Sequence, residues 1–401
     1  MPTDHDVVIV GGGPAGLSAA LFLLHHAPRL KGRLVVLERE RYPREKYCAG
    51  GIGGRAEMAL ARIGVTVDVP SVPCTGISLA LPKAQLVGRA RHIGRVVRRI
   101  EFDHRLAEVA RERGVRIEEG VKVHGVDARE DGVRVATSGG DLSTRVLVGA
   151  DGVGSVVRKA LGLGAGMWRA QVLEVDTDPT ERDTARDLMH FDVSDHEFVG
   201  YEWDFPTLVG GAPMVCRGAY HLVLPGHDAN EVDLAKRLAR RLERFGLDLA
   251  RCKKKRYAER GFAPHEACAR PRIVLIGEAA GVDPITGEGI AQALLYGEAL
   301  APYLSQKLKD GELSFADWPG ALRATRLGWD MAMRDRLCRR FFGPARSWFE
   351  DNFAQTPEGL EIGVQYFGGL RVDRKKAMQV AFSVAKSWLA NTGPSPLSGA
   401  L

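Results

Sequence analysis

Residues 6–20 read DVVIVGGGPAGLSAA, and this stretch decides the fold. Val7 to Val10 form a compact β-branched run, which is typical of a buried strand. Pro14 to His26 repeat leucine at helical spacing, and Leu34 to Leu37 form a second apolar run of the strand type. The sequence therefore predicts a β-α-β unit over residues 7–37.

The glycines between the first strand and the helix fit the pattern G-x-G-x-x-G. Gly11 permits a tight turn, and Gly13 lets backbone N–H groups reach a pyrophosphate. Gly16 lets the helix pack close to the strand, while Pro14 and Ala15 complete the motif. These residues are expected to bind a dinucleotide.

The end of the second strand narrows the choice of dinucleotide. Glu38 stands where a carboxylate hydrogen-bonds a ribose hydroxyl, and Arg39 follows it in the same predicted site. A carboxylate at this position disfavours a 2′-phosphate. We therefore expect FAD or NAD rather than NADP.

Two later motifs favour FAD. Residues 149–158 read GADGVGSVVR and include Asp151 and Gly152; residues 277–290 read GEAAGVDPITGEGI and include Gly277, Glu278, Gly287, Gly289 and Ile290. They resemble the D-G and G-D signatures of the flavoprotein family that includes aromatic hydroxylases, tryptophan halogenases and geranylgeranyl reductases. The resemblance implies a carboxylate on the flavin ribityl chain and a helix N-terminus directed at the isoalloxazine ring. Glu278 stands where the family has aspartate, and it is one methylene longer.

Three further stretches carry the resemblance. Arg99 precedes Phe102-Asp103 in the family pattern R-x-x-F-D, which implies flavin contact; a solvated helix face is the alternative. Residues 44–52 read REKYCAGGI, and residues 201–206 read YEWDFP. Both look like motifs of geranylgeranyl reductases, whereas halogenases have a G-E-S loop and W-x-W-x-I-P. The resemblance places Cys48, Ala49 and Gly50 at the flavin ring.

Cys48, Tyr201 and Trp203 are the candidates for catalysis. Cys48 is predicted to contact the ring and relay a proton; a buried, inert thiol is the alternative. In a strand Tyr201, Trp203 and Phe205 point to one face. This aromatic face is predicted to line the substrate cavity, with plain core packing as the alternative.

The predicted fold class is α/β, with a Rossmann-type FAD-binding domain interleaved with an antiparallel β-sheet substrate domain. The discontinuous FAD-binding domain is expected at residues 1–75, 96–170 and 264–310. The β-rich substrate domain is expected at residues 76–95 and 171–263. Residues 311–401 are expected to form a helical region, with a frayed tail from Asn391 onward.

The charge composition restricts which kinds of partner the protein is expected to bind. The formal net charge is +6, and the tight basic cluster is Arg251, Lys253, Lys254, Lys255 and Arg256. Without interleaved aromatic residues this cluster predicts no nucleic-acid binding. A solvated loop is its ordinary interpretation; an anionic cofactor or a peripheral membrane contact is the alternative. The arginines at 334, 336, 339 and 340 form a second basic group. The hypothesis for both groups is that they dock an acidic partner or a phosphate-bearing substrate.

The cysteines and the apolar runs bear on metal binding, on the redox compartment and on membrane insertion. The six cysteines show no C-x-x-C spacing and no zinc-type partner histidines, so we expect no metal and a reducing cytoplasm. No apolar run approaches the length of a membrane span.

The leading hypothesis is an FAD-dependent oxidoreductase that moves hydride between flavin N5 and a carbon–carbon bond of a hydrophobic substrate. No second G-x-G-x-x-G unit is present, so NAD(P)H at a shallow site, a reductase or a ferredoxin would supply the electrons. The alternatives are a monooxygenase or halogenase of the same superfamily, and a flavin-binding protein without turnover.

Overall fold

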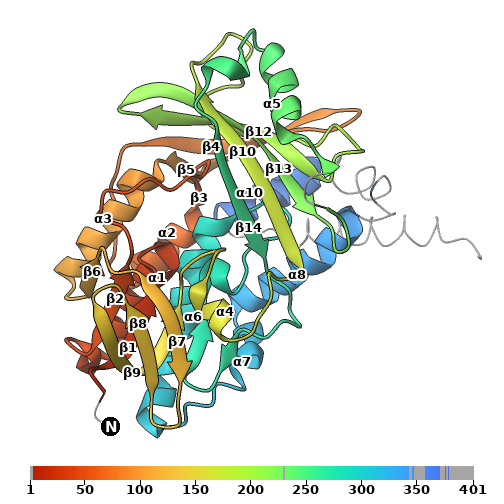
Figure 1. Ribbon diagram of the computed structural model, residues 1–401. Coiled ribbons are helices and arrows are strands. Elements are labelled where there is room, and N and C mark those ends of the chain that lie inside the picture. Colours follow the sequence, from red (N-terminus) through yellow and green to blue (C-terminus); the bar gives the residue numbers. More distant parts are fainter. Residues whose placement is uncertain are drawn as a thin grey trace, which may run out of the picture.

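The computed structural model describes residues 3–228, 231–342 and 357–370, together with residues 346, 375 and 378. Within these residues the strands form two sheets of eight strands each. Figure 1 shows the first sheet with the early, red to yellow part of the chain and the second sheet, largely green, extending away from it.

The first sheet has a parallel core. Its main path runs β15-β16-β9-β1-β2-β6, and β7 and β8 extend it antiparallel from β9. The strands are β1 (His5–Val10), β2 (Leu34–Glu38), β6 (Arg116–Glu119), β7 (Val123–Ala128), β8 (Val133–Thr137), β9 (Gly140–Gly149), β15 (Ala269–Arg270) and β16 (Ile273–Leu275). β1 pairs in parallel with both β2 and β9, and β9 pairs in parallel with β16. The carboxyl ends of these strands therefore meet at one edge.

Helices surround the first sheet and extend its core. They are α1 (Pro14–His26), α2 (Gly54–Arg62), α3 (Arg99–Glu112), α4 (Val156–Ala160) and α6 (Gly289–Asp310), with the short helices η1 (Pro28–Leu30) and η4 (Gly277–Ala279). α1 and α6 pack closely, since Ser18 Oγ donates to the Leu294 carbonyl at 2.6 Å. The N-terminal motif and the last flavin signature are thus held together although they are far apart in sequence.

The second sheet is mostly antiparallel, in the order β14-β10-β13-β12-β11-β4-β5-β3. Its strands are β3 (Gly51–Gly53), β4 (Ser71–Ala80), β5 (Gln85–Val97), β10 (Trp168–Thr177), β11 (Leu188–Asp192), β12 (Gly200–Val209), β13 (Ala212–Val223) and β14 (Lys255–Gly261). β11 pairs with β4 in parallel. This sheet takes in β3 and the start of β4, so it begins earlier in the chain than the boundary predicted at residue 76.

The two faces of the second sheet carry different residues because side chains alternate along each strand. Leu173 and Val175 of β10 pack on one face with Leu238 of α5 (Leu234–Glu243), which η3 (Leu249–Arg251) follows. The opposite face carries Trp168 and Val172 and meets α8 (Arg326–Phe341) and α10 (Pro357–Phe367). α7 (Trp318–Ala324) precedes α8 and packs against the first core.

The predicted fold class is confirmed: a parallel dinucleotide-type sheet is interleaved with a largely antiparallel sheet, and helices follow. The helical region predicted over residues 311–401 contains α7, α8 and α10, and the tail from Asn391 lies outside the described residues. None of the described helices has the length and apolar character to cross a membrane.

Candidate functional site

The main cavity lies along the carboxyl ends of β1, β2 and β9 and has a volume of about 670 Å³. Its β2 end is lined by Leu37–Glu40 and Val121–Val123, and its β14 end by Cys48, Tyr257 and Glu259. Ligands of open α/β sheets bind outside the carboxyl ends of the strands. The volume is within the range of about 300–1,000 Å³ that is usual for ligand pockets.

The glycine turn after β1 forms the floor of this cavity. Gly11 has φ of +105°, and an added Cβ would lie 2.4 Å from the Ala150 carbonyl oxygen, so only glycine fits. Gly13 lines the cavity, and the nearest atom to its Cβ position is Arg44 Nη2, 3.9 Å away. The backbone N–H groups at the start of α1 are therefore accessible to an anion.

Glu38 is held at the end of β2 by backbone donors. Its Oε2 accepts from Gly12 N at 2.9 Å, and its Oε1 accepts from Glu40 N at 3.0 Å. A carboxylate oxygen has two lone pairs, so each retains an acceptor position. The side chain lines the cavity with that capacity.

Arg44 is a cavity residue that the sequence analysis did not single out. Its Nη2 lies 3.4 Å from Glu38 Oε2 and 3.1 Å from Asp103 Oδ2. Its Nε is buried and has no hydrogen-bond acceptor among the described residues. A mostly buried guanidinium that lines the cavity beside the glycine turn fits a phosphate oxygen. Its position in the sequence could have identified it, because Arg44 lies six residues after Glu38 in the loop that leads to Cys48.

The carboxylate of Asp151 is used within the protein. It accepts from Ser155 Oγ at 2.5 Å and from Val156 N at 2.7 Å, which fixes the start of α4. Gly152 and Glu278 line the cavity nearby, and an added Cβ at Gly152 would lie 3.6 Å from Glu278 Oε2. The longer Glu278 side chain therefore reaches the part of the cavity next to the D-G motif.

Cys48 and Arg99 both line the main cavity. Arg99 donates from Nε and Nη2 to the two carboxylate oxygens of Asp103, at 2.7 and 2.8 Å. It is buried, so the alternative of a solvated helix face is wrong. Burial raises the pKa of the Cys48 thiol, and Gly50 N donates to its Sγ at 3.4 Å. Cys48 is therefore a neutral thiol near pH 7.

The cavity brings together most of the predicted cofactor residues. Those that line it are Gly11, Gly13, Pro14, Ala15, Glu38, Arg39, Cys48, Arg99, Asp151, Gly152, Glu278, Gly289 and Ile290. Gly16, Ala49, Gly50, Gly277 and Gly287 are not among its lining residues. Gly16 packs against the Gly11 carbonyl and Gly277 against Ala15, so both support the lining from behind.

Tyr201 and Trp203 do not line the main cavity. Their side chains share a face, as predicted, but that face packs against Cys338 of α8 and Val364 of α10. Tyr201 Oη donates to the Thr286 carbonyl at 2.5 Å. These rings pack together in the second core, and Tyr201 supports the loop before α6. Their role in lining a substrate cavity stays a prediction.

An ion-pair network surrounds that loop. Arg55 of α2 pairs with Glu288 and Asp330, and Arg334 of α8 pairs with Asp283, Glu288 and Asp330. All five side chains are at least mostly buried. Arg334 therefore does not belong to an exposed docking group, which corrects that part of the sequence prediction.

The basic cluster at residues 251–256 is also divided. Lys255 is buried in the second sheet, with its Nζ 2.6 Å from Asp176 Oδ2 and 3.7 Å from Glu174 Oε1. Lys253, Lys254 and Arg256 are exposed. Strand alternation removes Lys255 from the surface, so the cluster is smaller than the sequence suggested.

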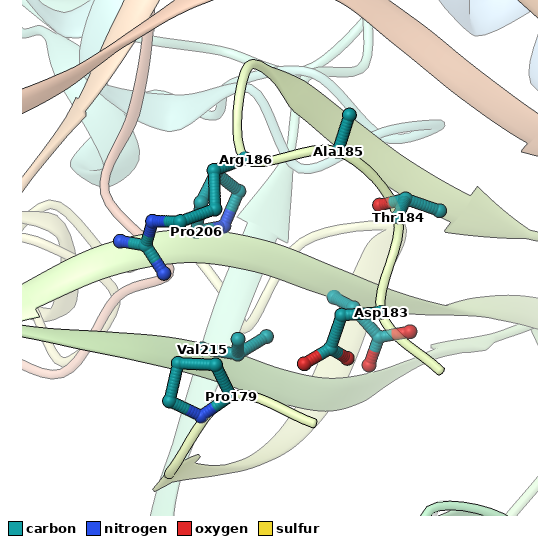
Figure 2. Close-up of a pocket in the computed structure, with 8 residues that line it drawn as sticks. Pro179, Asp183, Thr184, Ala185, Arg186, Pro206 and Val215 are labelled. Carbon is teal, nitrogen blue, oxygen red and sulfur yellow. The ribbon is translucent and has the colours of Figure 1, made fainter. Parts of the chain in front are cut away.

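Figure 2 shows a second hollow, beside Asp183, Arg186 and Pro206 of the second sheet region. Its volume is about 20 Å³, which is room for a water molecule and no more. Across the described residues, no group of three or more His, Cys, Asp or Glu side chains is arranged to hold a metal ion. The main cavity is therefore the candidate site.

The model of the FAD binding domain family matches residues 4–309 of the chain. The chain belongs to this family. The cavity agrees with it, since the glycine turn, the guanidinium of Arg44 and the remaining acceptor positions of Glu38 fit a pyrophosphate and a ribose. FAD is the cofactor.

Relatives narrow the family further. A digeranylgeranylglycerophospholipid reductase of Thermoplasma acidophilum is 24% identical over 77% of this chain and 80% of its own. A menaquinone reductase of Mycolicibacterium smegmatis is 31% identical over 40% of this chain and 41% of its own. The solved structure of a geranylgeranyl bacteriochlorophyll reductase-like protein of Thermoplasma acidophilum superposes with a TM-score of 0.66 at 19% identity, covering 96% of both chains. The protein is an FAD-dependent oxidoreductase related to geranylgeranyl reductases.

Proposed function

We propose that the protein reduces a carbon–carbon double bond of a hydrophobic, isoprenoid-type substrate. The observation that carries the proposal is the loop from Arg44 to Gly50, which follows β2 and places Cys48 at the β14 end of the cavity. This loop carries the resemblance to geranylgeranyl reductases. Two of the compared relatives are named as reductases of isoprenoid compounds, which supports the substrate class.

FAD, when bound and reduced, supplies two electrons and a hydrogen as hydride. The protein orients it. Arg44 and the N–H groups after Gly13 would hold the pyrophosphate, Glu38 would hold the ribose and Glu278 would hold the ribityl chain. The N-terminus of α6 lines the cavity through Gly289 and Ile290, and its positive dipole end favours negative charge on the ring.

Two of the groups that line the β14 end, Cys48 and Tyr257, are neutral and offer surface to an apolar substrate. Burial raises the pKa values of Cys48 and Tyr257, so both remain uncharged at neutral pH. The external electron donor is NAD(P)H or a reductase or ferredoxin, since the sequence carries one G-x-G-x-x-G unit.

The test is a half-reaction experiment. The FAD-loaded protein is photoreduced without oxygen and mixed separately with isoprenoid alkenes, isoprenoid quinones, aromatic acids or oxygen, and flavin reoxidation is followed by absorbance. We expect an isoprenoid double bond to reoxidise the flavin under anaerobic conditions, with a product two hydrogens heavier. Substrate modification that occurs with oxygen alone would identify a monooxygenase and contradict the proposal.

A further inference from the structure

Glu259 is a carboxyl group at the β14 end of the cavity that the sequence motifs do not include. It lies on β14, two residues after Tyr257, and both side chains line the cavity together with Cys48. β14 is an edge strand paired with β10, where Glu259 lies opposite Ala170. The side chain is therefore directed by the sheet and not by a flexible loop.

One oxygen of this carboxyl group is buried without a partner. Oε2 of Glu259 is inaccessible to solvent and has no hydrogen bond among the described residues. It lies against the loop before α6, since an added Cβ at Gly287 would be 2.7 Å from it. That Cβ would also be 3.1 Å from the Tyr220 ring. Buried polar atoms without partners are rare. Glu259 combines such an oxygen with a side chain that lines the ligand cavity, which points to a functional role.

The surroundings of Glu259 favour its protonated form. Burial is the largest influence and raises the pKa of Glu259 well above its ordinary value. The carboxylates of Glu278, Asp283 and Glu174 raise it further, and the ammonium of Lys46 opposes them. Asp283 and Glu174 are themselves paired with Arg334 and Lys255, so burial is the main reason that a carboxylate at Glu259 is costly.

Four further titratable groups that interact with Glu259 are uncharged. They are the phenols of Tyr201, Tyr220 and Tyr257 and the thiol of Cys48, each with a pKa raised by burial. None of them supplies a positive charge that would hold Glu259 ionised. The surroundings of Glu259 therefore favour the protonated form of a carboxyl that lines the cavity.

We propose that Glu259 is the acid that donates the proton during reduction of the substrate double bond. The inference rests on the proposed function. The π bond breaks, and one carbon receives hydride with two electrons from reduced FAD while the other receives the proton of Glu259. Two C–H bonds form, the flavin is oxidised, and Glu259 is left as a carboxylate that regains a proton from water.

Glu259 suits this role better than Cys48. The ordinary pKa is 4.5 for the carboxyl and 9.0 for the thiol, and burial raises both. Burial moves the pKa of the thiol further above neutral pH, whereas it moves the pKa of the carboxyl upward from below neutral pH, the direction that suits a general acid. Cys48 then contacts ligand at the same end of the cavity without donating the proton.

The test uses Glu259→Gln, which keeps the shape of the side chain and removes its acid. Glu259→Asp keeps an acid on a shorter side chain, and Glu118→Gln on β6 is the control, since Glu118 pairs with Arg116 away from the cavity. Infrared spectra at pH 7 should show the C=O stretch of a protonated carboxyl in wild type and in Glu118→Gln. That band should be lost in Glu259→Gln, whether or not FAD is bound.

Rates then separate the chemical role from folding. Reoxidation of the reduced flavin by the double-bond substrate should be slowed by about 100-fold or more in Glu259→Gln, with partial recovery in Glu259→Asp. Reoxidation by ferricyanide, which takes electrons without a proton, should be unchanged. The rate with the double bond should fall at high pH in wild type and stay level in Glu259→Gln.

Two failures are distinguishable. If no double bond reoxidises wild-type flavin, the proposed function is wrong, and the role of Glu259 as its acid is wrong with it. If wild type reacts and Glu259→Gln retains its rate or the infrared band, the function stands and Glu259 is not the acid.

Discussion

Arg55 of α2 donates from Nη1 to Asp330 Oδ2 of α8, 2.9 Å away, and so ties the FAD-binding part of the chain to the helices that follow it. Arg334 extends this contact to Asp283 and Glu288, on either side of the loop that precedes α6. The position of α8 and the shape of the cofactor loop are therefore linked through buried charges.

Replacement of Arg334 by alanine should destabilise the protein strongly. It would leave Asp283, Glu288 and Asp330 buried with too little positive charge, and breaking a buried pair costs about 3–5 kcal/mol. The free energy of unfolding, measured in urea, checks this. Arg336→Ala on the exposed face of the same helix is the matched control, and equal urea midpoints for both variants would show that the network adds no stability.

Replacement of Arg44 by methionine should weaken FAD binding. A hydrogen bond to a charged group contributes about 1.5–3 kcal/mol, which corresponds to a rise in Kd of roughly 10-fold to 150-fold. Quenching of FAD fluorescence on titration with apoprotein measures the change. The exposed Arg41 provides the control variant Arg41→Met, and an unchanged Kd in Arg44→Met would remove Arg44 from the phosphate site.

Alkylation of cysteines should report the cavity directly. Cys48 lines it, whereas the half-buried Cys252 follows η3 and lies elsewhere. Burial raises the pKa of Cys48, so its reaction with iodoacetamide should be slow at pH 7 and accelerate as the pH rises.

Bound FAD should protect Cys48 and leave Cys252 unaffected, as peptide mass spectrometry can show. Equal alkylation of Cys48 with and without FAD would indicate that the cofactor does not extend to the β14 end.

Stability should decline on the acid side partly through His190. Burial lowers its pKa below the ordinary 6.5, and its Nδ1 lies 3.1 Å from Ser78 Oγ. The folded protein therefore holds the ring neutral, while the unfolded chain binds a proton as the pH falls below 6.5. Unfolding becomes easier as the pH falls through that range.

The variant His190→Asn should show a smaller loss of unfolding free energy between pH 7.5 and pH 5.5 than wild type does. Urea titrations at the two pH values provide the comparison. The same loss in both proteins would assign the acid sensitivity to other groups.

Local motifs predicted the β2 end of the site well. The turn after β1 and the carboxylate after β2 are encoded within residues 6–38, and Gly13 and Glu38 both line the cavity. The β14 end was harder to predict. Alternation places Tyr257 and Glu259 on one face of a strand, but which face meets the cavity depends on pairing with β10, more than eighty residues away.

Long-range packing also explains the aromatic residues of β12. The period of two correctly grouped Tyr201 and Trp203, but nothing in residues 201–206 shows that α8 and α10 will cover them. The same holds for Lys255, whose acidic neighbours Glu174 and Asp176 lie on β10. The spacing of residues along a strand predicts which side chains share a face. Which other elements pack against that face is decided by tertiary contacts.

The order of strands in the first sheet determines how late in translation the sheet can be completed. β1 ends at Val10, its neighbour β9 begins at Gly140, and the strand that completes the parallel core begins at Ile273. At about 5–20 residues per second, the first β-α-β unit is translated on the order of ten to fifty seconds before β16. The apolar surface of α1 that α6 later covers stays unshielded during this interval. The cofactor site of a nascent chain is therefore complete only after α6 has been translated. Chains that end before α6 are expected targets of chaperones and proteases.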